Sequence, residues 1–359
     1  MIEQLVSEFV RQAPPYQMGT SVQEIKEKYG FREVYKLSAN ENPLGVSPLA
    51  AAAIQKAVRE ANFYPDASGS CLPRKLAAKL HLKPSQIMIT QGATAGLNVI
   101  GEVFVQPGDE VIFPTPTYPG YYNVVKKTGA KLTELPMGGD LEMDFDEILN
   151  HITEKTKLVM ICNPNNPTGI VSDAGKLLEF IKKVPKHAVV LVDEAYVHFV
   201  EGPYNSMVNE ISDDLNLVVL QTFSKLYGMA GTRIGYVMSN DEIMTYINRN
   251  NAGYTTNSLA YAAAEAALDD ADFVRRTLEN NREGRNFLTE ELTAMGCRVF
   301  PSSTNFIYAD CHCDAFRLSQ EVAKRGVMIR GNFPLTRISI GTPEQNARVV
   351  RAIREILCK

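Results

Sequence analysis

The spacing of apolar positions divides the chain into regions of different structure. Between about residues 85 and 240, short runs of β-branched and other apolar residues alternate with segments whose apolar positions recur every three or four residues. Continuous apolar runs are typical of strands buried on both faces, and the segments between them predict helices that cover the sheet. The strand candidates are residues 86–90, 109–118, 131–137, 157–167, 188–196, 217–224 and 233–239. This alternation predicts an α/β fold, with a large domain whose mostly parallel, seven-stranded sheet is flanked by helices.

After about residue 255 the pattern predicts a smaller α+β domain. Two long helical stretches come first, three spaced strands follow, and a helix closes the chain. The helical stretches are 258–270, 271–292 and 344–357, and the strand candidates are 297–309, 326–332 and 336–341. The first forty or so residues contain no buried-strand run. We therefore expect an N-terminal arm at 1–40, a large domain at 41–250 and a small C-terminal domain at 251–359.

The composition is that of an ordinary soluble protein, with 45% hydrophobic and 22% charged residues and a net charge of −4. Because basic residues are spread along an acidic chain, we expect neither nucleic acid nor an anionic membrane surface as a partner. No apolar run reaches the length of about 18 residues that a membrane span needs. The first residues lack the basic start and apolar run of a secretory signal, so we expect a cytoplasmic protein. The Cys-His-Cys sequence at 311–313 has no companion cluster, and we expect no metal site.

One lysine is the most informative residue for chemistry. Lys225 is flanked by the hydroxyls of Thr222 and Ser224, and Arg233 lies eight residues downstream. An amine beside hydroxyl donors and a fixed cation suits a Schiff base to an aldehyde that also carries a phosphate. The alternative is a solvated lysine at the start of a helix.

Other candidates lie where predicted strands end, which is where open parallel sheets bind ligands. Gly92, Ala93 and Thr94 enter a helix after the strand at 86–90, and a helix start offers free N–H groups to a phosphate. Tyr118 follows another strand and can stack on a flat ring. A plain turn and simple loop packing are the respective alternatives.

Polar residues at two further strand ends complete a pattern. Asn166, in the sequence NPNNPTG at 163–169, has an amide that can bond a phenolic oxygen. Asp193 ends an apolar strand and can pair with a protonated pyridine nitrogen, while Tyr196 can reach the same ring. A turn, a metal ligand or a helix cap are the alternatives. Arg337, on a strand of the small domain, suits a carboxylate, although a surface salt bridge is the default for an arginine.

Together these groups specify a ligand with a phosphate, a pyridinium, a phenolic oxygen, an aromatic face and an aldehyde. Pyridoxal 5′-phosphate has all five.

The chain resembles the fold-type I, class I and II aminotransferases, and within them the histidinol-phosphate aminotransferases. The motifs that carry the resemblance are LSANENPLG at 37–45, YPD at 64–66, NPNNPTG at 163–169, VDEAYVHF at 192–199, SKLYGMAGTRIGY at 224–236, NSLA at 257–260 and RISIGTPEQN at 337–346.

The resemblance implies a role for each matching residue. Lys225 would be the Schiff-base lysine and Asp193 the pyridinium partner, while Arg337 would take the substrate α-carboxylate. Tyr64 would reach the cofactor phosphate of a neighbouring subunit, so a homodimer is implied. The resemblance assigns the remaining residues either to the cofactor, as for Asn166, Tyr196 and Arg233, or to the substrate, as for Tyr16, Asn40 and Arg330.

The resemblance therefore favours amino transfer from histidinol phosphate to 2-oxoglutarate. The partners it implies are a small-molecule amino donor and a 2-oxo acid, with Lys225 as the general base and acid. Only GNFPLT separates Arg330 from Arg337, a short interval for this family. An aromatic or broad-range aminotransferase, or a threonine-phosphate decarboxylase, stays open as an alternative. A cofactor-binding transcription regulator is disfavoured by the acidic charge and by the absence of room for a DNA-binding domain. A nicotinamide oxidoreductase is disfavoured because no G-x-G-x-x-G opens the first helix after a strand.

Overall fold

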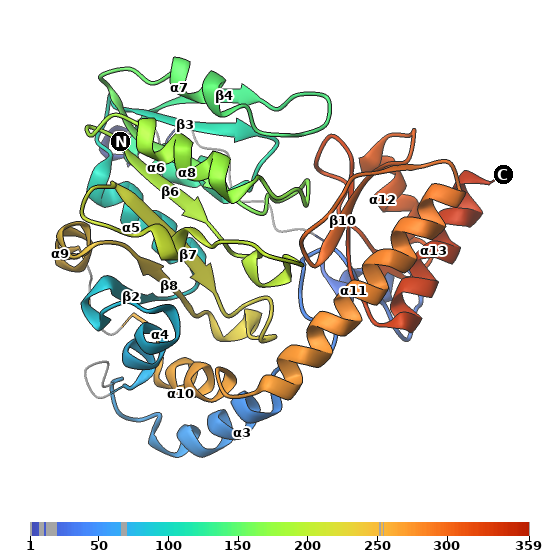
Figure 1. Cartoon of the computed structure of the whole chain (residues 1–359). Helices are drawn as coiled ribbons and strands as arrows, with labels where there is room; N and C mark the ends of the chain where they lie inside the picture. Colours follow the sequence, from blue (N-terminus) through green and yellow to red (C-terminus); the bar gives the residue numbers. More distant parts are fainter. Residues whose placement is uncertain are drawn as a thin grey trace.

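The computed structural model describes residues 2–6, 11, 20–65, 70–250, 253 and 255–358. Its largest element is a seven-stranded sheet with the order β2-β8-β7-β6-β5-β3-β4 (Figure 1). The strands are β2 (Ile87–Thr90), β3 (Glu110–Thr115), β4 (Lys131–Pro136), β5 (Thr156–Cys162), β6 (Val189–Asp193), β7 (Leu217–Thr222) and β8 (Gly235–Met238). Only β8 runs against its neighbours, β2 and β7. The expected mostly parallel, seven-stranded α/β sheet is confirmed.

Helices cover both faces of this sheet because both faces of its strands are apolar. In β6, Val190 and Val192 enter one core while Leu191 enters the other. The first core is closed by helices that include α4 (Leu72–Leu80), α7 (Phe145–Asn150), α8 (Ala174–Lys183) and α10 (Ser258–Ala267). The second is closed by α5 (Ala93–Phe104), α6 (Gly120–Thr128) and α9 (Asp241–Arg249). Fully buried strands explain why the sequence shows continuous apolar runs rather than alternation.

A smaller antiparallel sheet lies beside the large one (Figure 1). Its central strand β10 (Phe306–Asp310) pairs with β9 (Arg298–Val299) and with β12 (Thr336–Ser339). The helices α11 (Ala271–Ala294), α12 (Ala315–Ala323) and α13 (Pro343–Leu357) contribute to its own apolar core. The 24-residue helix α11 runs from the neighbourhood of α10 to this smaller region without a break (Figure 1).

The N-terminal segment joins the smaller region through a strand that the pattern did not predict. After α2 (Val22–Tyr29), the two-residue strand β1 (Tyr35–Lys36) pairs in parallel with β11 (Val327–Met328). The segment then continues into α3 (Pro48–Ala57), which packs against α10. The domain limits at residues 40 and 250 remain predictions.

The chain direction places six strand ends at one edge. Since β2, β3, β4, β5, β6 and β7 all run the same way, their carboxyl ends meet there. Within the ranges described above, no helix has the length and apolar character needed to cross a membrane.

Candidate active site

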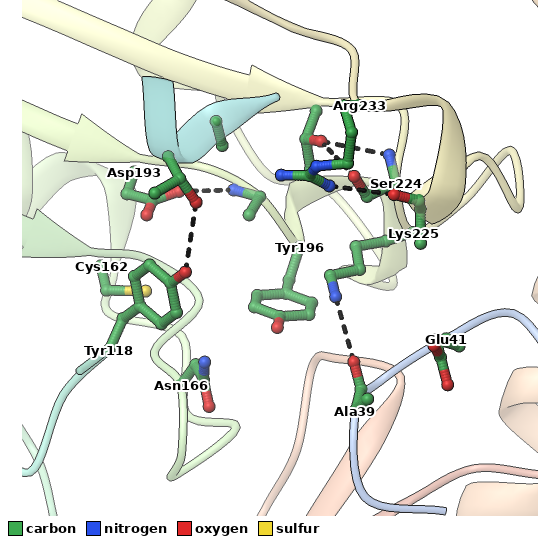
Figure 2. Close-up of a pocket in the computed structure, with 15 residues that line it drawn as sticks. Ala39, Glu41, Tyr118, Cys162, Asn166, Asp193, Tyr196, Ser224, Lys225 and Arg233 are labelled. Carbon is green, nitrogen blue, oxygen red and sulfur yellow. Dashed lines mark hydrogen bonds between the residues drawn. The ribbon is translucent and has the colours of Figure 1, made fainter. Parts of the chain in front are cut away.

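A cavity of about 310 Å³ lies at the carboxyl edge of the large sheet (Figure 2). Its volume falls in the range of small-molecule sites. Ten of the predicted site residues line it: Ala93, Thr94, Tyr118, Asn166, Asp193, Tyr196, Thr222, Ser224, Lys225 and Arg233. They come from five segments that are far apart in the sequence, residues 93–94, 118, 166, 193–196 and 222–233, so the fold brings the predicted chemistry together.

Lys225 points into this cavity from the segment after β7 (Figure 2). Its Nζ donates a hydrogen bond to the carbonyl oxygen of Ala39 at 3.3 Å and lies 5.6 Å from the centre of the Tyr196 ring. Burial, with the nearby charges of Arg337 and Arg233, lowers the pKa of Lys225 to about 8. An amine with such a pKa is neutral often enough near pH 7 to act as a nucleophile.

Asp193 ends β6 and is almost completely buried, with 3% of its surface exposed. Its Oδ1 accepts the backbone N–H of Ala195 at 3.1 Å, and its Oδ2 accepts the hydroxyl of Tyr121 at 3.3 Å. Burial raises the pKa of Asp193 to about 6, although these two donors and the charge of Lys225 act in the opposite direction. A buried carboxylate with only neutral donors favours a cationic ligand group beside it.

The start of α5, the hydroxyls of Thr222 and Ser224 at the end of β7, and Arg233 form a cup. Gly92, the N-cap of α5, has φ 75°, and a Cβ there would lie 2.5 Å from Nη2 of Arg233. The hydroxyl of Thr222 donates to Oγ of Ser224 at 2.9 Å. A helix start, two hydroxyls and a guanidinium are the donors that a phosphate monoester needs.

Tyr118 lines the cavity beside this cup. Its hydroxyl lies 3.4 Å from Oγ1 of Thr94 (Figure 2). Its ring meets the ring of Tyr121 edge to face, with the centroids 5.8 Å apart. A tyrosine held in this way presents a flat apolar surface to a bound aromatic ring.

Arg337 reaches Asn166 from the small sheet. Its Nη1 donates to Oδ1 of Asn166 at 2.5 Å and its Nη2 to the carbonyl of Ser38 at 2.7 Å. Arg337 is 6% exposed, and its Nε has no hydrogen-bond partner. Burial, with the charge of Arg330 nearby, lowers the pKa of Arg337 to about 10. A buried cation held by neutral acceptors, with one free donor, favours an anionic ligand.

The other predicted substrate residues lie around Arg337 or elsewhere. Arg330 exchanges two backbone hydrogen bonds with Arg337, at 3.0 and 2.9 Å. Asn40 is buried and its Nδ2 donates to the Tyr196 hydroxyl at 3.0 Å. Tyr64 is 83% exposed and does not line the cavity. Tyr16 lies outside the residues that the structure describes.

Five lining residues were not among the predicted ones: Ala39, Glu41, Cys162, Ala195 and Ala230. Tyr121, which holds Asp193, was also missed. No helical spacing links Tyr121 to Tyr118, because Tyr118 precedes Pro119, the N-cap of α6, whereas Tyr121 lies in the first turn of that helix.

Comparison with known proteins assigns the chain to a family. The family model for aminotransferases of class I and II matches residues 32–353. The chain belongs to the class I and II aminotransferases. Membership confirms the expected family, its cofactor pyridoxal 5′-phosphate and its transaminase chemistry, in which an amino donor and a 2-oxo acid are the substrates.

Individual relatives match over nearly the whole chain. The chain is 37% identical to histidinol-phosphate aminotransferase 2 of Carboxydothermus hydrogenoformans, covering 98% of this chain and 99% of the relative. It is 35% identical to the histidinol-phosphate aminotransferase of Caldicellulosiruptor saccharolyticus, with 98% and 99% covered. Among solved structures, the histidinol-phosphate aminotransferase of Sinorhizobium meliloti in complex with pyridoxal-5′-phosphate aligns with a TM-score of 0.90 at 25% identity, covering 98% of this chain and 97% of that one.

Proposed function

We propose that the protein transfers the amino group of histidinol phosphate to 2-oxoglutarate. The observation that carries this proposal is the buried Arg337, which has a free Nε and neutral acceptors on its other nitrogens. Histidinol phosphate bears a phosphate and no α-carboxylate, whereas 2-oxoglutarate bears carboxylates. One cationic subsite at Arg337 and Arg330 would therefore accept each anion in turn. The names of the relatives that match nearly the full chain support this choice of donor.

The residues around the cavity fit the cofactor. Its phosphate would lie in the cup of Gly92, Ala93, Thr94, Thr222, Ser224 and Arg233. Asp193 would hold the ring nitrogen, Asn166 and Tyr196 the phenolic oxygen, and Tyr118 the ring face. When bound, pyridoxal phosphate supplies an electrophilic carbonyl and an electron-poor ring that stabilises negative charge on the substrate Cα.

Lys225 and Asp193 divide the remaining work. Lys225 would anchor the cofactor and, once displaced by the substrate amine, take the proton from the substrate Cα and, as a general acid, deliver it to C4′, the former carbonyl carbon of the cofactor. Asp193, ionised, would keep the ring nitrogen protonated. Arg337 would fix the anionic end of the substrate, so that Cα faces Lys225.

A homodimer belongs to the same proposal. Phe63 and Tyr64 are 70% and 83% exposed, and Tyr64 would reach the cofactor phosphate of a second copy. Tyr16 would lie near the substrate beside Asn40, and we expect the protein in the cytoplasm. Light scattering on the purified holoenzyme tests the dimer, with a monomeric mass as the contradicting result.

A half-reaction screen tests the donor. Holoenzyme is mixed with histidinol phosphate, with single amino acids including the aromatic ones, or with threonine phosphate, and the visible absorbance of the bound cofactor is followed. Loss of this absorbance with histidinol phosphate at the lowest concentration supports the proposal. Preference for an aromatic amino acid, or release of CO₂ from threonine phosphate, would replace it by the corresponding alternative.

Asp193→Asn tests the placement of the cofactor. We expect turnover to fall by about 10³-fold, in the range of losing one preorganised electrostatic group, while the cofactor stays bound. Normal turnover would refute the role of Asp193.

A further inference from the structure

We infer that Tyr121 is a positioning residue that aims the Asp193 carboxylate at the cofactor ring and keeps it ionised. This inference rests on the proposed placement of the ring nitrogen at Asp193. Tyr121 does not line the cavity, so its role would be to act through Asp193.

The Tyr121 ring is fixed in place by its neighbours. It is fully buried on α6, and its ring meets Phe113 with the centroids 5.7 Å apart and Tyr118 with the centroids 5.8 Å apart. A large side chain packed edge to face on two sides cannot turn its hydroxyl away without opening a void. Tyr121 therefore braces both the residue proposed for the ring face and the residue proposed for the ring nitrogen.

The hydroxyl of Tyr121 completes the hydrogen bonding of Asp193. With Ala195 N–H on Oδ1 and Tyr121 O–H on Oδ2, each carboxylate oxygen has a donor, and the two donors come from different elements. Two donors on opposite oxygens fix the plane of the carboxylate. Bonds to an ionised oxygen are stronger than neutral ones, especially where water is excluded.

Other groups near Asp193 cannot replace this donor. The titratable and charged groups that face it are Tyr121 from α6, Cys162 from β5, its neighbours Glu194 and Tyr196, and Lys225. The Cys162 thiol donates to the carbonyl of Pro164 at 3.4 Å, and the Lys225 amine to Ala39. Burial raises the pKa of the Tyr121 hydroxyl well above its ordinary value, so it stays a neutral donor at any working pH.

Removing the Tyr121 hydroxyl should change the protonation of the Asp193 carboxylate while leaving the packing of the ring unchanged. Phenylalanine keeps the ring contacts and leaves Oδ2 of Asp193 without a donor. Because Tyr121 lowers the pKa of Asp193 against the effect of burial, its loss lets the carboxyl group hold its proton to a higher pH. A protonated Asp193 holds the cofactor ring less well.

The experiment compares Tyr121→Phe with Tyr122→Phe. Tyr122 is the next residue on α6, also contacts Phe113, and bonds Glu134 outside the site, so it is a matched control. Apoprotein is titrated with pyridoxal phosphate, and the dissociation constant is measured between about pH 5 and 8, around the shifted pKa of Asp193. We expect Tyr121→Phe to weaken pyridoxal phosphate binding about tenfold, as for a lost hydrogen bond to a charged group. The pH below which binding weakens should rise by about one unit.

A double-mutant cycle separates positioning from general damage. In the Asp193→Asn background, Tyr121→Phe should change cofactor binding less than twofold, because the anion that the hydroxyl serves is gone. An equal effect in both backgrounds, or a single variant that behaves as Tyr122→Phe, overturns the inference. Failure of the unmutated chain to take up pyridoxal phosphate would instead overturn the proposed function on which it rests.

Discussion

Two arginines are proposed to bind anions at the site, and their surroundings differ: Arg233 lines the cavity, while Arg337 bonds Asn166, a lining residue, from the small sheet. On the large-sheet side Arg233 is exposed and bonds the carbonyl of Ala230 at 2.9 Å, close to a helix start and two hydroxyls. On the small-sheet side Arg337 is buried, with its Nε free of partners. An exposed cation without an anionic partner keeps its hydration and loses little free energy. A buried cation has lost its hydration, and a bound anion offsets that desolvation free energy.

This difference suits two kinds of ligand. A resident cofactor is held by many moderate donors, of which no single one is decisive, and by a covalent anchor. A substrate that enters and leaves in each turnover depends on one strong subsite, here at Arg337, which binds the correct anion tightly and neutral competitors weakly. Predictions that separate the two sides therefore test this division directly.

The largest expected effect is at the covalent anchor. Lys225→Ala should reduce transamination by at least about 10⁴-fold, since it removes both the nucleophile and the general base. The cup on the large-sheet side should still bind the cofactor, now without the absorbance of a lysine-bound form. Spectra and steady-state rates check this, with the exposed Lys176→Ala as control. A lysine-linked spectrum in Lys225→Ala would show that another residue is the anchor.

Arg337→Gln tests the small-sheet side alone. We expect kcat/KM to fall by about 10²-fold for the donor and for the 2-oxo acid, because a charge-assisted contact to a buried anion is lost. The dissociation constant for pyridoxal phosphate should stay within twofold. Arg298→Gln, on the same sheet but exposed and paired with Asp140, is the control. Equal losses in cofactor binding and in substrate binding would contradict the assignment of the small-sheet side to the substrate alone.

Asp193 is the exception on the cofactor side, since it is both buried and charged. Its pKa is raised from an ordinary 3.8 to about 6. The stability this shift contributes is therefore present below about pH 4 and lost as the pH rises through 6. At pH 8 Asp193→Asn should stabilise the apoprotein by up to about 3 kcal/mol, an advantage that disappears below pH 4.

Urea unfolding of the apoproteins at the two pH values measures this effect. The exposed Asp213→Asn should shift neither curve. Destabilisation of Asp193→Asn at both pH values would show that the hydrogen bonds of the carboxylate outweigh its desolvation.

The smallest effect is expected in the cup. Arg233→Gln should weaken pyridoxal phosphate binding about tenfold, since a helix start and two hydroxyls remain to hold the phosphate. KM for the substrates should change little. Absorbance titration of the apoprotein measures the dissociation constant. A loss of more than about 10³-fold would contradict this prediction, because the helix start and the hydroxyls would then not hold the phosphate without Arg233.

The cofactor-binding residues could be predicted from the sequence because they lie at the carboxyl ends of strands whose apolar runs are easily recognised. Asp193, Asn166 and Lys225 each come at or just after a long apolar run, and parallel strands bring such ends together. Ala39 could not be predicted, because it reaches the cavity from a segment whose only strand is two residues long and carries no readable period. Tyr64 is a different case, since its predicted contact needs a second copy of the chain.

Arg337 and Lys225 hold consecutive carbonyls of the N-terminal segment. Arg337 Nη2 donates to Ser38, and Lys225 Nζ donates to Ala39, while the next residue, Asn40, bonds both Ser339 and Tyr196. Peptide units in sequence cannot move independently. A displacement of the Arg337 guanidinium by a bound anion is therefore transmitted to the Lys225 amine, through the single peptide that links Ser38 to Ala39.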